Sequence, residues 1–216
     1  MLIADRNGMM VGKRLPYDAE VEYLQSVKLG TAFDDGLGTY ILTNYTPTLA
    51  DKISLRVFIS STSNAVFGTN YGWGARAYTI NGREAWIGSS VKWLSSIIAN
   101  SWMDIVIDPP NNILTVNGSS AWTIPEVSGE PIRPIYLFGI YYEVRASVAY
   151  IPDGTRLAEI SAERNGEKIL DMISVRFTNE NNISEGAMYD RVSGELFRNA
   201  GTGAFVIGPD IPASAA

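Results

Sequence analysis

The 216-residue chain contains neither cysteine nor histidine. It therefore has no thiolate nucleophile, no Ser-His-Asp triad, no imidazole base and no zinc site of the usual Cys/His kind. Any catalytic site would have to be built from carboxylates. Disulfides are excluded too, so a packed core must hold the fold, and a chain of this length buries about 70% of its extended surface on folding.

Clustered positive charge is also missing. Seventeen basic residues stand against 23 acidic ones, which gives a formal net charge of -6 at pH 7. Binding to a nucleic-acid backbone depends largely on grouped Lys and Arg side chains that release counterions, and the sequence has no such group. We therefore expect no nucleic-acid partner.

Long apolar runs are absent as well. No stretch approaches the about 20 consecutive apolar residues that span a bilayer, so no membrane insertion is expected. In residues 1–12 the polar Asp5, Arg6 and Asn7 interrupt the apolar residues, so this segment lacks the apolar core of a signal peptide. The sequence predicts a soluble protein, and a cell-surface, extracellular or virion-associated location would need another route of export.

Turn-forming residues are abundant, with 20 Gly and 10 Pro. Asn-Gly pairs favour two-residue type I′ hairpin turns, because both residues tolerate positive φ. Short runs rich in β-branched and aromatic residues separate the turns, which is typical of an antiparallel all-β protein. The Asn-Gly pairs are Asn7-Gly8, Asn81-Gly82, Asn117-Gly118 and Asn165-Gly166.

The clearest hairpin spans residues 102–118. Met103, Ile105 and Ile107 alternate with more polar residues, which predicts one buried and one partly solvated strand face. The two prolines that begin at Pro109 cannot donate hydrogen bonds to a ladder, so the turn is expected there.

Thirteen further runs are predicted to be strands, too many for an immunoglobulin-type sandwich and closer to a larger jelly roll. Residues 93–98 fit either a helix or a strand. No linker or repeat divides the chain, so residues 15–208 are expected to form one β-sandwich domain, with a flexible N-terminal segment 1–14 and a flexible tail 209–216. The predicted strands are 20–24, 40–44, 52–60, 65–67, 75–80, 84–87, 135–142, 145–151, 157–164, 168–177, 186–189, 195–198 and 205–207.

Three stretches resemble one family: residues 15–24 (LPYDAEVEYL), the hairpin 102–118 and residues 188–208 (MYDRVSGELFRNAGTGAFVIG). They are similar to the concanavalin A-like lectin/glucanase superfamily, specifically to small laminin-G-like domains of gut bacteria and their prophages. The resemblance implies an antiparallel two-sheet jelly-roll β-sandwich, in which one sheet is often concave and binds glycans or proteins. It implies no activity, because the superfamily contains lectins, hydrolases, adhesion modules and structural domains.

The segment 70–74 is the main ligand-binding candidate. Tyr71 and Trp73 lie on a loop flanked by glycines, next to the amide of Asn70. Sugars stack apolar C–H faces on aromatic rings, and their hydroxyls hydrogen-bond to amides and carboxylates. The alternative is that Trp73 packs inward as a core residue. The other tryptophans are predicted to be core or rim residues: Trp86, Trp93, Trp102 and Trp122.

Catalysis and metal binding have weaker signals. A retaining glucanase of this superfamily would carry Glu-x-Asp-x-x-Glu on one strand, and the chain lacks this string. Glu20 and Glu22 share a strand face and are the candidate carboxylate pair. The ordinary explanation for them is two exposed glutamates on an edge strand. We expect no enzyme and no cofactor, with calcium as the one metal that the oxygen-rich loops would suit. The candidate calcium ligands are Asp34, Asp35 and Asp51, or Asp104 and Asp108 with Asn111.

These observations lead to a first hypothesis, a non-catalytic carbohydrate-binding (lectin-like) or adhesion module whose partner is a glycan or a glycosylated surface. The alternative is a structural or assembly protein, such as a phage tail or cell-surface accessory, that binds protein partners. A third hypothesis, a glycoside hydrolase, lacks a convincing carboxylate pair. Exposed aromatic residues would favour the glycan, and a large apolar patch would favour a protein partner.

Overall fold

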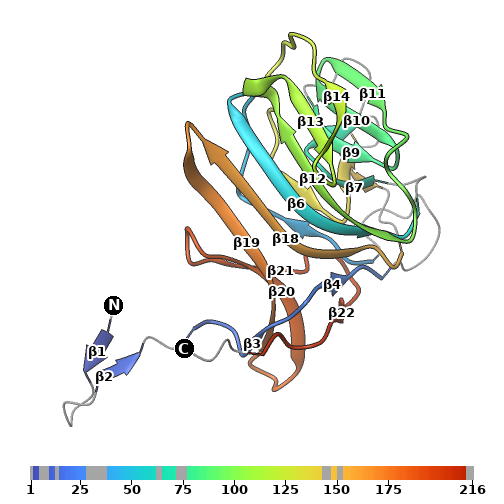
Figure 1. Cartoon of the computed structure of the whole chain (residues 1–216). Helices are drawn as coiled ribbons and strands as arrows, with labels where there is room; N and C mark the ends of the chain where they lie inside the picture. Colours follow the sequence, from blue (N-terminus) through green and yellow to red (C-terminus); the bar gives the residue numbers. More distant parts are fainter. Residues whose placement is uncertain are drawn as a thin grey trace.

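In the computed structural model, two β-sheets pack face to face and form a sandwich (Figure 1). The structure describes residues 2–4, 10–12, 15–27, 38–61, 65–71, 77–142, 147–149 and 153–212. The only helix in these ranges is the single 3₁₀ turn η1 (Pro109–Asn111). The prediction of an all-β sandwich is confirmed.

The larger sheet has eleven strands, and its neighbouring strands are antiparallel. Three short strands, β3 (Ala19–Glu20), β4 (Leu24–Gln25) and β22 (Val206–Ile207), pair beside the main path. Along that path the order is β14 (Ser119–Thr123), β13 (Ile113–Val116), β12 (Ser101–Asp108), β6 (Asp51–Ile59), β18 (Arg156–Arg164), β19 (Glu167–Thr178), β20 (Ser184–Asp190) and β21 (Leu196–Arg198).

The smaller sheet has six strands and is antiparallel as well. A separate three-stranded sheet contains β17 (Ser147–Ala149), β16 (Ile140–Tyr142) and β8 (Asn70–Tyr71), and β16 and β8 run parallel, unlike the rest. The order of the six-stranded sheet is β11 (Ser90–Trp93), β10 (Glu84–Gly88), β9 (Ala77–Asn81), β7 (Ala65–Gly68), β15 (Tyr136–Leu137) and β5 (Ile41–Leu42).

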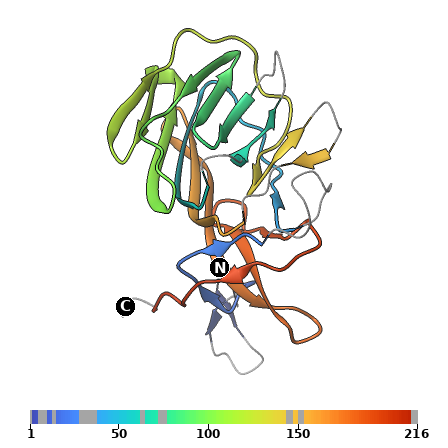
Figure 2. The same ribbon diagram turned by 90° about the vertical axis from the view of Figure 1, so that its right-hand side faces the viewer.

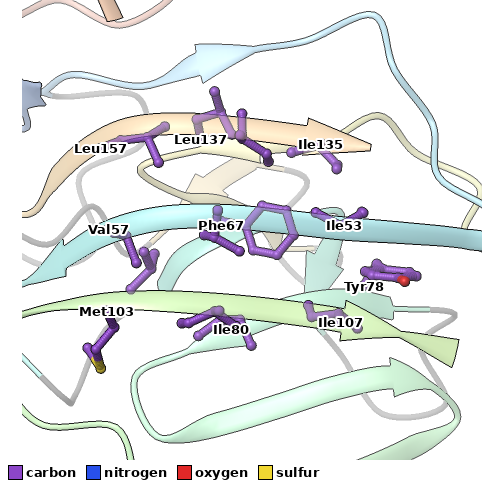
Figure 3. Packing of buried hydrophobic residues seen from close by; sticks show 14 of the residues in the cluster. Ile53, Val57, Phe67, Tyr78, Ile80, Met103, Ile107, Ile135, Leu137 and Leu157 are labelled. Atoms are coloured by element: carbon purple, nitrogen blue, oxygen red, sulfur yellow. The ribbon is translucent and has the colours of Figure 1, made fainter. Parts of the chain in front are cut away.

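The core lies between these two sheets (Figure 3). Along β6 and β12, alternate residues point inward, so Met103, Ile105 and Ile107 are all buried as predicted. The opposite sheet contributes Phe67 and Tyr78, which are also buried. Burying each such side chain stabilises the fold by about 1.5–3 kcal/mol. Other core residues labelled in Figure 3 are Ile53, Val57, Ile80, Ile135, Leu137 and Leu157.

Two Asn-Gly pairs form the predicted tight turns. Asn117 and Gly118 have φ of 51° and 74°, and Asn165 and Gly166 have φ of 52° and 80°. Each pair lies between residues that face each other across a hairpin. The two positive φ values in each turn are those of a type I′ turn.

The turn at Asn81-Gly82 lies one residue later than predicted. Asn81 pairs with Glu84, so the two turn residues are Gly82 and Arg83. This register sets Ile80 opposite Ala85, and both are fully buried. Burial of the inward face therefore decides the register, which local turn preference cannot do alone.

Two predicted strands are interrupted. Segment 20–24 is divided between two short strands with different partners. Its first part belongs to β3, which pairs with β19, and its last part belongs to β4, which pairs with β18. Segment 135–142 breaks at Phe138, whose φ is 64°. Phe138 is buried against Phe205, with ring centroids 4.9 Å apart, so tertiary packing holds a conformation that the sequence does not favour.

The tail predicted to be flexible is anchored at its start. The backbone N–H of Glu22 donates to Pro209 O over 2.8 Å, and that of Ile211 donates to Glu20 O over 2.9 Å. Arg176 forms an ion pair with Asp210 at 2.6 Å. In Figure 2 the blue N-terminal and red C-terminal strands accordingly lie together. Pro209, Asp210 and Ile211 therefore contact the sheet.

The N-terminal segment predicted to be flexible contains a short hairpin. Leu2–Ala4 (β1) pairs with Met10–Gly12 (β2) in an antiparallel register. In Figure 1 this hairpin lies apart from the sandwich. The domain boundary at residue 14 stays a prediction.

The turn between β20 and β21 is built around the side chain of Asp190. The Asp190 carboxylate accepts hydrogen bonds from the backbone N–H groups of Val192 and Ser193, both at 3.1 Å, and from the Ser193 hydroxyl at 2.6 Å. Gly194 has φ of 76°, and its N–H donates to Asp190 O over 2.8 Å. The side chain of Asp190 thus fixes the turn between β20 and β21.

We expect Gly194→Val to destabilise the protein by about 1–3 kcal/mol, because a β-branched residue resists positive φ. A Cβ at this position would meet only Tyr189 Oη at 3.9 Å, so crowding adds little. Gly194→Asn is the matched control, since Asn tolerates this conformation. Urea unfolding measures both variants, and equal losses for Val and Asn would contradict a conformational cause.

Candidate functional site

The candidate site is the face of the large sheet that points away from the core. On this face Arg56 and Glu159 are exposed and Trp102 is half-buried. Two adjoining hollows, of about 300 and 490 Å³, share Arg56, Glu159 and Arg191 in their lining. Together they form one shallow depression, called the outer groove below. Its main side chains are Glu20, Glu22, Arg56, Trp102, Glu159 and Arg191.

Strand register brings the groove residues together. Asp104 of β12 faces Arg56 of β6, and Arg56 faces Glu159 of β18. Glu159 in turn faces Ile173 of β19. Residues directly opposite each other lie about 4.5–5.5 Å apart at Cβ, so these four side chains form one row across the sheet.

Aromatic rings form one end of the groove. The Trp102 ring lies 5.9 Å from the rings of both Phe58 and Tyr23, measured between centroids. The Arg156 guanidinium lies 4.7 Å from the Tyr23 ring and 4.8 Å from the Phe58 ring, and that of Arg56 lies 5.6 Å from the Trp102 ring. Cation–π contacts of this kind hold the rings in place.

The positive charges of the groove are already paired. Arg56 Nη1 lies 3.0 Å from Asp104 Oδ1. Arg191 makes two hydrogen bonds to Asp171, at 2.9 and 3.1 Å, and Lys168 Nζ lies 3.4 Å from the same carboxylate. The hydrogen bonds to Asp171 raise the pKa of Arg191. An anionic ligand would have to displace these pairs.

Several carboxylates of the groove remain available to a ligand. The exposed carboxylates of Glu22 and Glu159 make no hydrogen bond or ion pair within the described ranges. Glu20 accepts one hydrogen bond, from Tyr17 Oη at 3.1 Å. Burial and Glu20 raise the pKa of Tyr17 to about 12, so the phenol keeps the proton that it donates. These oxygens can accept hydrogen bonds from ligand hydroxyl groups.

The first two residues of the predicted ligand segment lie on another sheet. Asn70 and Tyr71 form β8, whose backbone pairs with Tyr141 and Tyr142 of β16. Trp73 lies outside the described residues, so the role of the segment stays a prediction.

An aromatic cluster lies beside β8. The Arg133 guanidinium lies 3.9 Å from the centre of the Tyr141 ring, and the Tyr136 ring lies 6.2 Å from that of Tyr141. Tyr136 is buried and Tyr141 is half-buried. The strand that pairs with Asn70 and Tyr71 is therefore rich in aromatic residues and distant from them in sequence.

Of the proposed calcium ligands, Asp51 has a structural role. It is fully buried and accepts hydrogen bonds from Arg164 at 2.6 and 2.9 Å and from Tyr45 Oη at 2.7 Å. Burial raises the pKa of this carboxyl, but the hydrogen bonds from Arg164, Tyr45 and the Thr48 N–H outweigh it and lower the pKa overall. Asp51 therefore stays ionised and anchors one end of β6.

The described members of the second proposed calcium set, Asp104, Asp108 and Asn111, have partners within the protein. Asp108 accepts hydrogen bonds from Asn111 and thereby caps the 3₁₀ turn, and Asp104 is paired with Arg56. Asp34 and Asp35 lie outside the described residues. Within the part of the chain that is described, no three acidic side chains gather to hold a metal ion.

Sequence analysis identified only some groove residues. Glu20 and Glu22 were recognised as a pair on one face, and Trp102 was expected at the core or rim. Glu159 and Arg191 were missed, because alternation along 157–164 shows which residues face outward but not which strands lie beside them. The signal for these two residues exists only in the strand order.

Among the described residues, no helix has the length and apolar character needed to cross a membrane. Comparisons with protein-family models, curated proteins and solved structures found no match.

Proposed function

We propose that this protein is a non-catalytic carbohydrate-binding or adhesion module that binds its glycan in the outer groove. The observation that carries the proposal is the half-buried Trp102 in the same hollow as Glu22 and Glu159, whose carboxylates make no hydrogen bond or ion pair among the described residues. An aromatic ring offers a stacking surface for the C–H face of a sugar. The carboxylates offer acceptors for its hydroxyl groups.

The shape of the groove also supports this proposal. Hollows of about 300 and 490 Å³ lie within the range of about 300–1,000 Å³ that is usual for small-ligand sites. The groove crosses β12, β6 and β18 without a closed wall, so a chain of sugar units can enter along the sheet. Trp102 is held by Phe58, Tyr23 and Arg56, so little side-chain freedom is lost on binding.

We further propose that the sandwich is a jelly roll of the concanavalin A-like type. Two features support this assignment: the face-to-face antiparallel sheets and the resemblance of residues 15–24, 102–118 and 188–208 to that superfamily. A glycan site on the open face of one sheet agrees with how relatives use this fold. The assignment itself implies no activity.

A glycan array on the purified chain tests the proposal, followed by titration of the best ligand against Glu159→Ala. We expect this variant to bind at least tenfold more weakly, because a hydrogen bond to a charged group contributes about 1.5–3 kcal/mol. Glu159 makes no hydrogen bond or ion pair among the described residues, and its electrostatic interaction with Arg191 is exposed to solvent, so the melting temperature should change little. Glu126→Ala, an exposed loop variant, is the matched control. Binding that survives both Glu159→Ala and Trp102→Ala would exclude the outer groove.

A separate prediction concerns the segment 70–74. If this segment makes a second glycan contact, separate from the outer groove, Tyr71→Ala and Trp73→Ala should weaken glycan binding with little change in melting temperature, because side chains that stack on a ligand do not support the core. A fall of several degrees for Trp73→Ala, without any effect on binding, would assign Trp73 to the core instead.

A second candidate function is a structural or assembly role with protein partners. One observation favours it: Val91, Trp93 and Ile98 are all at least half exposed. Exposed apolar side chains that lie together mark protein-interaction surfaces.

A further inference from the structure

Strand β11 is an open edge of the six-stranded sheet. The backbone N–H of Leu94 donates to Arg83 O over 2.6 Å. Hydrogen-bonded and non-hydrogen-bonded pairs alternate along an antiparallel ladder, so this bond determines which residues of β11 hydrogen-bond to β10. Val91 and Trp93 therefore direct their own N–H and C=O groups away from β10. In the described part of the chain no strand pairs with that side of β11. Such an edge is a template for an added strand.

Apolar side chains border this edge. Val91 is 50% exposed and Trp93 60%, and both lie on the sheet face opposite the buried Ala85 and Ile87. Ile98, 59% exposed, follows one turn later. We call Val91, Trp93 and Ile98 with the open backbone of β11 the β11 edge. Trp93, which the sequence predicts to be a core or rim residue, is therefore not part of the core.

Lys92 sets the charge of the β11 edge. It lies between Val91 and Trp93, is exposed, and has no ion pair within the described ranges. If a second copy paired antiparallel through both Val91 and Trp93, Lys92 would face the Lys92 of that copy. Like charges directly opposite each other destabilise a strand pair, whereas opposite charges stabilise it. The charge therefore disfavours a second copy and favours an acidic residue at the opposing position.

We propose that the β11 edge binds an extended segment of a partner protein by strand addition, and that this segment carries an acidic residue between two apolar ones. The acidic residue lies opposite Lys92, and the apolar residues lie opposite Val91 and Trp93. Backbone hydrogen bonds supply affinity, and the alternating side chains supply specificity. The β11 edge and the outer groove are on different sheets, so this inference does not depend on glycan binding.

The test is a titration of the ¹⁵N-labelled full chain with the capped pentapeptide Thr-Ile-Glu-Ile-Thr, followed by NMR. We expect the amide signals of Val91 and Trp93 to shift. The same peptide with lysine at its centre should bind about three- to tenfold more weakly, and Lys92→Glu should invert that preference. A peptide N-methylated at both isoleucines should not bind, because it cannot complete the ladder.

Two variants separate this surface from a general apolar effect. Trp93→Ala should weaken binding, whereas Ile132→Ala, which removes another exposed apolar side chain, should not. The proposal is overturned if the Val91 and Trp93 signals do not shift, or if the glutamate and lysine peptides bind equally. It is also overturned if the protein alone forms dimers that Trp93→Ala abolishes, because the occupant is then a second copy.

Discussion

A chain that ends at Glu185 is expected to lose its fixed tertiary structure. The truncation removes most of β20 and all of β21 and β22, including the buried Ala187, Met188 and Phe205. Burial of a large apolar side chain contributes about 1.5–3 kcal/mol. The loss also uncovers Val175 of β19, which packs against Ala187 in a second apolar cluster. Together these losses rival the about 5–15 kcal/mol of net stability of a typical domain.

Near-ultraviolet circular dichroism and calorimetry measure this loss. The truncated chain should show no near-ultraviolet signal and no cooperative transition, or should be insoluble. A chain that ends at Pro212 is the control, because it retains the anchoring contacts of Pro209, Asp210 and Ile211. A cooperative transition at an unchanged temperature after truncation at Glu185 would show that the C-terminal strands are an appendage.

Arg164→Met is expected to destabilise the protein by about 3 kcal/mol, because it leaves the buried Asp51 carboxylate without its cationic partner. Asp51 is fully buried, whereas the Arg164 side chain is partly exposed, so solvent keeps the cost at the lower end of the range for broken buried pairs. Arg56→Met is the matched control. It breaks the exposed Arg56–Asp104 pair and should cost no more than about 1 kcal/mol.

The pH dependence distinguishes this charge effect from lost packing. Hydrogen bonds keep the pKa of Asp51 below its usual value in the folded protein, despite burial. Its stabilising contribution is therefore present above the unfolded pKa of about 3.9 and is lost as pH falls through the folded pKa. Urea unfolding should show a large difference between wild type and Arg164→Met at pH 7 and a smaller one near pH 3. An equal difference at both pH values would indicate that Arg164 acts through packing.

The outer groove and the β11 edge lie on different sheets and suit different ligands. In the groove, the cations Arg56 and Arg191 are already paired, and Glu22 and Glu159, which make no hydrogen bond or ion pair among the described residues, line the same hollow as Trp102. At the β11 edge Lys92 has no ion pair in the described part of the chain, and its sequence neighbours Val91 and Trp93 are exposed. A polar ligand rich in hydroxyl groups suits the first surface, and an apolar strand with a negative charge suits the second. The two proposals together describe a protein that binds a glycan on one sheet and a partner protein at the edge of the other.

Sequence alone determined the features that depend on neighbouring residues. The turns at Asn117-Gly118 and Asn165-Gly166 follow from residues that tolerate positive φ. The buried face of β12 follows from alternation, and the reversal at Gly194 follows from the short polar side chain of Asp190 and the freedom of glycine. Each of these is fixed within a few residues of chain, so the pattern is sufficient.

Tertiary structure decided everything that depends on which strands become neighbours. Glu22, Trp102 and Glu159 line one hollow only because β12, β6 and β18 are adjacent and the N-terminal segment crosses their end. Trp93 and Trp122 both lie on edge strands, β11 and β14, yet Trp93 is exposed and Trp122 is buried. Trp93 pairs with Glu84 on the face of its sheet that points away from the core, whereas Trp122 pairs with the buried Leu114 on the core face. A residue's own sequence neighbours fix the face on which it lies, but burial depends on what covers that face, and distant segments supply that cover.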